Sequence, residues 1–226
     1  MKLAALFSGG KDSTYVVHRA LQDGHDVVRL ISFAPKNPDS YMFHHPNIHL
    51  TNLLAQALTI PQTVVPTAGK KEHELQDLEQ ALRILKGIDG VAAGALASRY
   101  QHDRVTMICK KLGLAVYAPV WQQDPEAYVR TLGDEGFVYC LTKVACEGLG
   151  KEWLGKTIDK TTIDALLALS KKFRFHPAGE GGEYESLVLD CPVFKKQLVI
   201  DDAATTWDGE TGTYLVKRAH LQAKPA

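Results

Sequence analysis

The chain has 226 residues and equal numbers of basic and acidic side chains, 26 of each, so its formal net charge at pH 7 is zero. Hydrophobic residues make up 45% and charged residues 23%, a composition typical of a globular protein with one large or two small domains, which excludes wholesale disorder. A protein that binds nucleic acid without sequence preference is usually strongly basic. The equal numbers of basic and acidic side chains therefore speak against general nucleic-acid binding.

The first two-thirds of the chain alternate short apolar runs with segments of helical periodicity. The expected strands are at 3–7, 27–33, 62–65, 91–95, 114–118 and 137–144, and the expected helices at about 12–21, 50–58, 75–85, 98–112, from 125 onward and at 162–173. Ser98 and Asp124 are in capping positions, and Gly24 and Gly113 follow helices as stops. This rhythm predicts an α/β fold, a parallel sheet with helices on both faces.

The texture of the sequence changes after Pro177. Three β-rich runs follow at 185–189, 194–200 and 213–219, with turn residues between them and no convincing helix. We expect an antiparallel meander in a smaller C-terminal lobe. The predicted domains are therefore 1–145, an α/β domain, and 146–226, a substrate-binding lobe that is β-rich after about residue 177.

The cysteines and the apolar runs predict the cellular setting. The cysteines have long, irregular gaps and no CxxC pair, which speaks against a zinc knuckle or a dense disulfide framework and predicts buried thiols in a reducing cytosol. They are Cys109, Cys140, Cys146 and Cys191. No apolar run approaches the roughly 20 residues of a membrane span, so we expect a soluble cytoplasmic protein with no membrane segment.

The sharpest motif is the loop between the first expected strand and the first expected helix. It reads Ser8, Gly9, Gly10, Lys11, Asp12, Ser13. Glycines let successive backbone N–H groups approach an anion, and the helix that follows directs its positive dipole end to the same place. Lys11 could add charge and Asp12 could bind Mg²⁺, so the loop predicts a phosphate site.

This SGGxDS loop resembles the PP-loop of the ATP pyrophosphatases, enzymes of adenine-nucleotide α-hydrolase-like fold that cleave ATP between its α- and β-phosphates. The resemblance implies ATP and Mg²⁺ as cofactors, and it implies that the loop surrounds the departing pyrophosphate. It also implies that the backbone near Ser32 and Phe33, at the end of the second strand, meets the adenine.

Four further segments narrow the choice: 41–48, 94–101, 147–155 and 179–186. Together they resemble the diphthine–ammonia ligase family over nearly the whole chain, from Met1 to about Leu221, with GEGGEYE at 179–185 as the most specific mark. The resemblance implies ATP-dependent amidation of diphthine, a trimethylated histidine of elongation factor 2, through an acyl-adenylate, with ammonium as donor and AMP and pyrophosphate as by-products. His45 and Gln122-Gln123 depart from the family pattern and bear on the acceptor side.

Candidate site residues follow from these segments. Arg99 is the expected α-phosphate partner, because a planar guanidinium binds phosphate oxygens in pairs, and its alternative is a solvated first-turn arginine. Gly94 is expected on the nucleotide side. The residues expected on the acceptor side are His44, Asn47, Arg99, Tyr100, Glu147, Glu180, Glu183, Tyr184 and Glu185.

Glu180, Glu183 and Glu185 form an acidic cluster around Tyr184. Such a cluster suits Mg²⁺, ammonium or the trimethylammonium of diphthine, the last helped by an aromatic face, and its alternative is an acidic surface turn. With Lys11, Asp12 and Arg99, Glu183 and Glu185 are the expected catalytic residues. Asp12 is the expected metal ligand.

Other interpretations remain open at this point. His44, His45 and His49 form HHxxxH, which is a metal motif or, more simply, a polar wall of the acceptor pocket. The rival functions are another PP-loop ATP pyrophosphatase with a small-molecule or tRNA acceptor, and a non-catalytic nucleotide sensor. The expected partners are diphthine-bearing elongation factor 2 and ammonium, with a homodimer as one open assembly.

Overall fold

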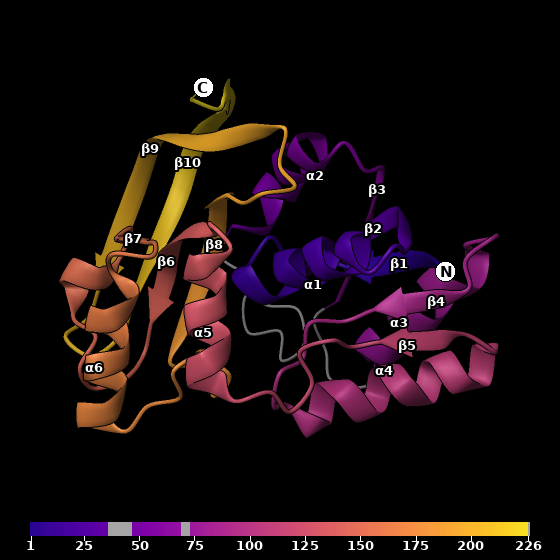
Figure 1. Cartoon of the computed structure of the whole chain (residues 1–226), viewed down its shortest axis with the longest axis horizontal. Coiled ribbons are helices and arrows are strands. Elements are labelled where there is room, and N and C mark those ends of the chain that lie inside the picture. The colour runs from indigo at the N-terminus through magenta and orange to yellow at the C-terminus, as the bar shows by residue number, and fades with distance from the viewer. Residues whose placement is uncertain (36–46, 69–72, 226) are drawn as a thin grey trace. The chain divides into compact units, whose positions relative to one another are not determined.

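The computed structural model describes residues 1–35, 47–68 and 73–225, and its chain divides into two compact units (Figure 1). The first unit is Met1–Ser8, Asp12–Gln56 and Ile60–Trp121, and the second is Gly9–Lys11, Ala57–Thr59 and Gln122–Ala226. Three residues of the glycine loop therefore count with the second unit.

The first unit is built on a parallel sheet, as the sequence predicted. Its strands are β1 (Lys2–Leu6), β2 (Asp26–Pro35), β3 (Gln62–Thr67), β4 (Gly90–Ala92) and β5 (Ala115–Tyr117). Their order is β3-β2-β1-β4-β5, and each neighbouring pair is parallel.

Helices of the first unit cover both faces of this sheet. They are α1 (Lys11–Gln22), η1 (Ile48–Leu50), α2 (Thr51–Leu58), α3 (His73–Ile84) and α4 (Arg99–Leu112). Ala4 of β1 packs in one core with Leu78 of α3 and Val105 of α4. Leu3 and Ala5 alternate with Ala4 along the strand and are equally buried, so the opposite face is covered as well.

Local signals set the ends of α4 as expected. The hydroxyl oxygen of Ser98 accepts a hydrogen bond from the backbone N–H of Gln101 at 3.4 Å. Gly113 takes the left-handed conformation, φ 69°, that ends the helix and that residues with a Cβ rarely adopt.

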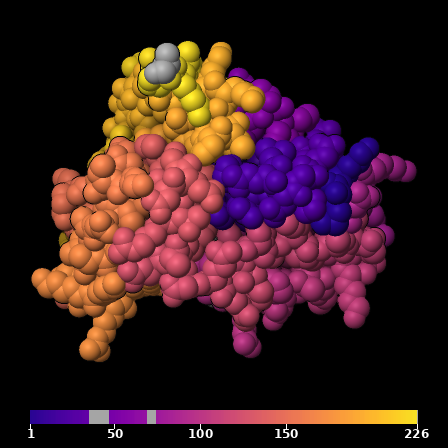
Figure 2. Space-filling model, in the orientation of Figure 1, coloured from indigo at the N-terminus to yellow at the C-terminus, as the bar shows by residue number. Residues whose placement is uncertain are grey.

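The second unit carries an antiparallel sheet with two helices. Its elements are α5 (Pro125–Asp134), β6 (Val138–Val144), η2 (Lys151–Trp153), β7 (Thr157–Ile158), α6 (Ile163–Phe173), β8 (Tyr184–Asp190), β9 (Lys196–Trp207) and β10 (Gly212–Ala223). The sheet order is β7-β6-β10-β9, and β8 also pairs with β6. Figure 2 shows the long β9–β10 hairpin at the surface in orange and yellow, in keeping with its many exposed residues.

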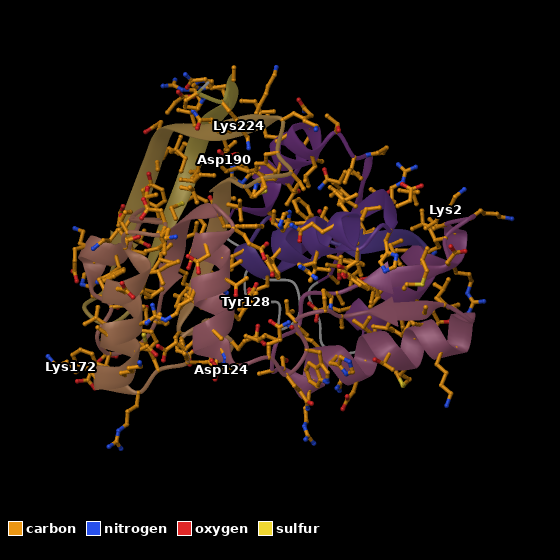
Figure 3. All side chains as sticks on the ribbon, viewed as in Figure 1. Lys2, Asp124, Tyr128, Lys172, Asp190 and Lys224 are labelled. Carbon is orange, nitrogen blue, oxygen red and sulfur yellow. The ribbon has the colours of Figure 1, made fainter. Side chains whose placement is uncertain are left out.

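Two contacts fix the ends of elements in the second unit, and Figure 3 labels Asp124, Tyr128, Asp190 and Lys224. Asp124 caps α5 by accepting the N–H of Ala127 at 2.8 Å, and Tyr128 of the same helix is fully buried. The ammonium of Lys224 lies 2.7 Å from the carboxylate of Asp190, which joins the end of β10 to the end of β8.

The strand expected at 137–144 lies in a different sheet from the one that the sequence predicted. It was expected in the parallel sheet, but β6 pairs antiparallel with β7, β8 and β10 in the second sheet. The structure divides at Trp121 and Gln122, ahead of the boundary expected at 145, and α5 and β6 lie in the second unit. A strand that is buried on both faces has the same continuous apolar pattern in a parallel and in an antiparallel sheet. The sequence pattern alone therefore could not assign this strand to one of the two sheets.

The C-terminal strands differ in part from the expected meander. β9 and β10 pair along nearly their whole length as an antiparallel hairpin. β8 instead pairs with β6, from Tyr184 opposite Val144 to Asp190 opposite Val138. Among the described residues, no helix is both long and apolar enough to cross a membrane.

Candidate functional site

The strand order locates the candidate nucleotide site. The chain runs outward from β1 through β2 and β3, then crosses to β4 and β5 on the other side of β1. Open α/β sheets bind ligands at the carboxyl ends of the strands where this direction reverses, which here are β1 and β4. The glycine loop follows β1, and Gly94 follows β4, so two segments singled out in the sequence reach this edge.

The loop is organised by its two serines. The backbone N–H of Ser8 donates to the hydroxyl of Ser13 at 3.2 Å, and the two hydroxyl oxygens lie 3.2 Å apart. Gly9 turns the chain with a φ of +80°, in the left-handed region. Helix α1 begins two residues later, so the positive end of its dipole lies at the end of β1.

Gly94 lies against the first turn of α1. A Cβ built on Gly94 would stand 2.9 Å from the carbonyl carbon of Asp12, closer than real Cβ atoms approach other atoms, and 3.1 Å from the nitrogen of Ser13, tighter than most real Cβ contacts. The structure thus brings together Gly94, Asp12 and Ser13, which the sequence assigned separately to the nucleotide. Asp12 is half-buried in this turn.

Ser32 and Phe33 lie near the end of β2. The hydroxyl of Ser32 donates to the carbonyl of Phe7 at 2.6 Å and accepts from the side-chain amide of Gln62 at 2.7 Å, so it links β2 to the residue that follows β1 and to the first residue of β3. Ser32 is fully buried, and Phe33 packs in the core. Contact of this backbone with adenine stays a prediction.

Arg99 and Tyr100 open helix α4. Arg99 is exposed at the first helical position. The guanidinium of Arg104 stacks 3.4 Å from the centroid of the Tyr100 ring and donates to the Tyr100 carbonyl, so Tyr100 is held by a cation one turn along. Arg104 was not among the expected site residues, although its i, i+4 spacing from Tyr100 can be read from the sequence.

Lys11 is part of the second unit and almost fully buried, with 2% of its surface exposed. Its ammonium donates to the carbonyl of Ala178 at 2.6 Å, and its backbone N–H donates to the hydroxyl of Ser186 at 3.1 Å. The lysine expected to meet phosphate therefore contacts the turn that precedes β8.

The acidic cluster is divided among different contacts. The carboxylate of Glu183 accepts two backbone N–H groups, from His176 at 3.0 Å and Gly181 at 2.8 Å. Glu185, on β8, lies 3.5 Å from the ammonium of Lys143 on β6. Tyr184 is buried, and its hydroxyl donates to the carbonyl of Pro177 at 2.6 Å.

The remaining candidates are more scattered. Glu147 is exposed, Glu180 is half-buried, and Asn47 is buried at the start of η1, where its carbonyl accepts the N–H of Leu50. His44, and with it His45, lies outside the described residues, so the HHxxxH interpretation is untested. Within the described ranges no group of three or more His, Cys, Asp or Glu side chains could hold a metal ion.

The thiols behave as the sequence predicted for three of four cysteines. Cys109, Cys140 and Cys191 are buried and unpaired by disulfides, and Cys146 is half-buried. Burial raises the pKa of Cys140 and of Cys191 to about 12. Burial and then the negative charge of Glu183 raise the pKa of Cys146 to about 11. At neutral pH these thiols are poor nucleophiles.

Comparison with known proteins gives two family matches and several close relatives. The family model described as diphthamide synthase N-terminal domain matches residues 1–116, and that described as diphthamide synthase C-terminal domain matches residues 124–222. A solved structure described as a predicted subunit of tRNA methyltransferase from Methanocaldococcus jannaschii is 17% identical, covers 85% of this chain and 98% of that chain, and has a TM-score of 0.48.

Curated relatives agree with the family models. The chain is 37% identical to diphthine–ammonia ligase of Rattus norvegicus, over 89% of this chain and 83% of that protein. It is 35% identical to diphthine–ammonia ligase of Homo sapiens, over 90% and 84%. The diphthine–ammonia ligase of Schizosaccharomyces pombe is 35% identical over the whole chain, which spans 40% of that longer protein. The chain therefore belongs to the diphthamide synthase family of carbon–nitrogen ligases, as the resemblance in its motifs implied.

Proposed function

We propose that this chain amidates diphthine on elongation factor 2, using ATP and ammonium and releasing AMP and pyrophosphate. The observation that carries the proposal is the likeness to diphthine–ammonia ligases, at 37% identity over 89% of the chain. The placement of the SGGKDS loop at the carboxyl end of β1 supports it, because this is where a sheet of this topology binds a nucleotide.

The residues around the loop fit a bound triphosphate. A 12-residue helix directs its N-terminus there, and the close approach of Gly94 to Asp12 leaves backbone rather than side chain along this edge. Ser8, Gly9, Gly10, Asp12 and Ser13 would hold the pyrophosphate end of ATP. The exposed guanidinium of Arg99 would bind the α-phosphate in two-pronged fashion.

Asp12 would be the protein ligand of Mg²⁺. Among the described residues no larger cage exists, and Mg²⁺ beside a nucleotide is commonly held by one or two carboxylates together with substrate phosphates. Mg²⁺ bound there would neutralise charge that builds on the phosphates.

The chemistry needs activation of a carboxylate, which is a poor electrophile. Its oxygen attacks the α-phosphorus of ATP, giving an acyl-adenylate and pyrophosphate. Ammonia then displaces AMP, leaving the amide and giving its proton to solvent or a nearby base. The rival functions, a different acceptor or a nucleotide sensor, are not favoured, because the curated relatives are ligases that act on diphthine.

We expect free ammonium to be the nitrogen donor. The two family domains account for most of the chain. In addition, none of its described cysteines has the low pKa of a glutaminase nucleophile. The protein, ATP, Mg²⁺ and diphthine-bearing elongation factor 2 should give amide, AMP and pyrophosphate with ammonium but not with glutamine. Mass spectrometry of the modified peptide and an AMP assay measure this. Product formed from glutamine in ammonium-free buffer would refute it, and AMP release without amide would refute the proposed acceptor.

Glu183 offers a test of the acidic turn. We expect Glu183→Gln to lower the free energy of unfolding by about 1–3 kcal/mol, because the amide replaces one of two acceptor oxygens and leaves a backbone N–H facing a donor. Amidation should fall at least tenfold, while ATP affinity should stay within about threefold. Urea unfolding, calorimetry with ATP and the amidation assay measure these, with Glu210→Gln, at an exposed glutamate in the turn between β9 and β10, as control. Equal and small effects in both variants would show that Glu183 belongs to a solvated surface turn and has no role in amidation.

A further inference from the structure

The buried ammonium of Lys11 is unusual for a residue in a phosphate loop. It lies in the second unit, bonded to the carbonyl of Ala178 at 2.6 Å and 5.4 Å from the centroid of the Tyr184 ring. Only 2% of the residue is exposed. Burying an ammonium costs free energy unless the group is hydrogen-bonded. The Ala178 carbonyl and the Tyr184 ring offset that cost, so they explain the buried position of Lys11 better than a role as a solvent-exposed phosphate ligand does.

The backbone around Lys11 is fixed from the same direction. The N–H of Lys11 donates to the hydroxyl of Ser186, and the carbonyl of Gly9 accepts the N–H of Val188 at 3.0 Å. Ser186 and Val188 are both buried residues of β8. Main chain and side chain of this segment therefore both contact the region that runs from Ala178 to Val188.

The turn at 176–183 is organised by bonds that converge on its backbone. Glu183 accepts two of its N–H groups, and the hydroxyl of Tyr184 donates to the carbonyl of Pro177. The ring nitrogen Nδ1 of His176 accepts the N–H of Ala178 at 3.2 Å. The carbonyl of Ala178 is the point in this network where a positive charge is bound.

We propose that Lys11 is a positioning residue for the 176–183 turn and not a ligand of phosphate. This rests on the proposed function, in which the glutamates of that turn serve the acceptor and ammonia side. Without the ammonium, the Ala178 carbonyl loses a charged donor and the turn shifts. The loss then appears in turnover of the acceptor and not in affinity for ATP.

Lys11→Met tests this, because methionine keeps an unbranched apolar side chain and removes the charge. We expect ATP affinity by calorimetry to stay within about threefold and kcat for amidation to fall at least tenfold. Hydrogen exchange of residues 176–184 should become faster. The control is Lys156→Met, which removes another lysine of the same unit that lies over an aromatic ring, 4.0 Å from the centroid of Trp153, and should change none of these.

Lys11→Arg separates the two roles even where Lys11→Met fails to fold. A guanidinium keeps the charge a phosphate ligand needs but is too large for the buried position, so positioning predicts low kcat with ATP affinity intact. A double-mutant cycle with Tyr184→Phe should be non-additive in kcat, because both residues act on the same turn.

Three outcomes would overturn the proposal. They are a tenfold or larger loss of ATP affinity in Lys11→Met, full activity in Lys11→Arg, and unchanged hydrogen exchange at residues 176–184. If the unmodified protein does not amidate diphthine, the proposed function fails, but ATP affinity and hydrogen exchange still decide the role of Lys11.

Discussion

Changing Asp12 to Ala should abolish ATP cleavage, with a loss of about a thousandfold or more in AMP release and no change in fold. Asp12 lies in the first turn of α1, at the end of β1 and against the backbone of Gly94. A carboxylate among anion-binding N–H groups would repel a triphosphate unless a cation stood between them. Its removal therefore removes the expected Mg²⁺ ligand.

The matched control is Asp103→Ala, which removes a carboxylate that is 71% exposed on α4 of the same unit. It should leave AMP release and the melting temperature unchanged. Asp12→Asn should be nearly as inactive as Asp12→Ala, because the amide keeps the shape and loses the charge. Full AMP release by a folded Asp12→Ala protein would contradict the interpretation of the loop as a PP-loop.

Adding one methyl group at Gly94 should also have a large effect, lowering both the stability of the protein and its affinity for ATP. Gly94→Ala would place a Cβ 2.9 Å from the carbonyl carbon of Asp12 and 3.0 Å from its oxygen, both backbone atoms that no side-chain rotation can move away. We expect a loss of about 1–3 kcal/mol in unfolding free energy. ATP affinity should fall at least tenfold, because the backbone that we propose surrounds the phosphates must shift. Calorimetry with ATP and urea unfolding measure the two effects.

Gly113→Ala distinguishes this from a general cost of replacing glycine. Gly113 has a φ of +69° and nothing within 4 Å of a built Cβ, so its replacement costs about 1 kcal/mol through backbone strain alone. It should lower stability and leave ATP affinity intact. Unchanged ATP affinity in Gly94→Ala would show that the approach of β4 to α1 has no part in the site.

The sequence was sufficient wherever the deciding contacts are local. The caps of Ser98 on Gln101 and of Asp124 on Ala127, both expected from the sequence, each join residues three positions apart. Such bonds follow from residue type and spacing alone. The same holds for the strand–loop–helix order around the candidate nucleotide site and for the family motifs.

Only the tertiary structure decided the partners of side chains far apart in the chain. The ammonium of Lys11 and the carbonyl of Ala178 are 167 positions apart, so no spacing rule could have directed that lysine to the acidic turn. The pairing of β6 with β8 was equally hidden, because a strand buried on both faces carries no mark of the sheet it joins. Glycine loops and helix caps are set by backbone geometry within a few residues, whereas burial of a charge depends on which distant segments the fold brings to it.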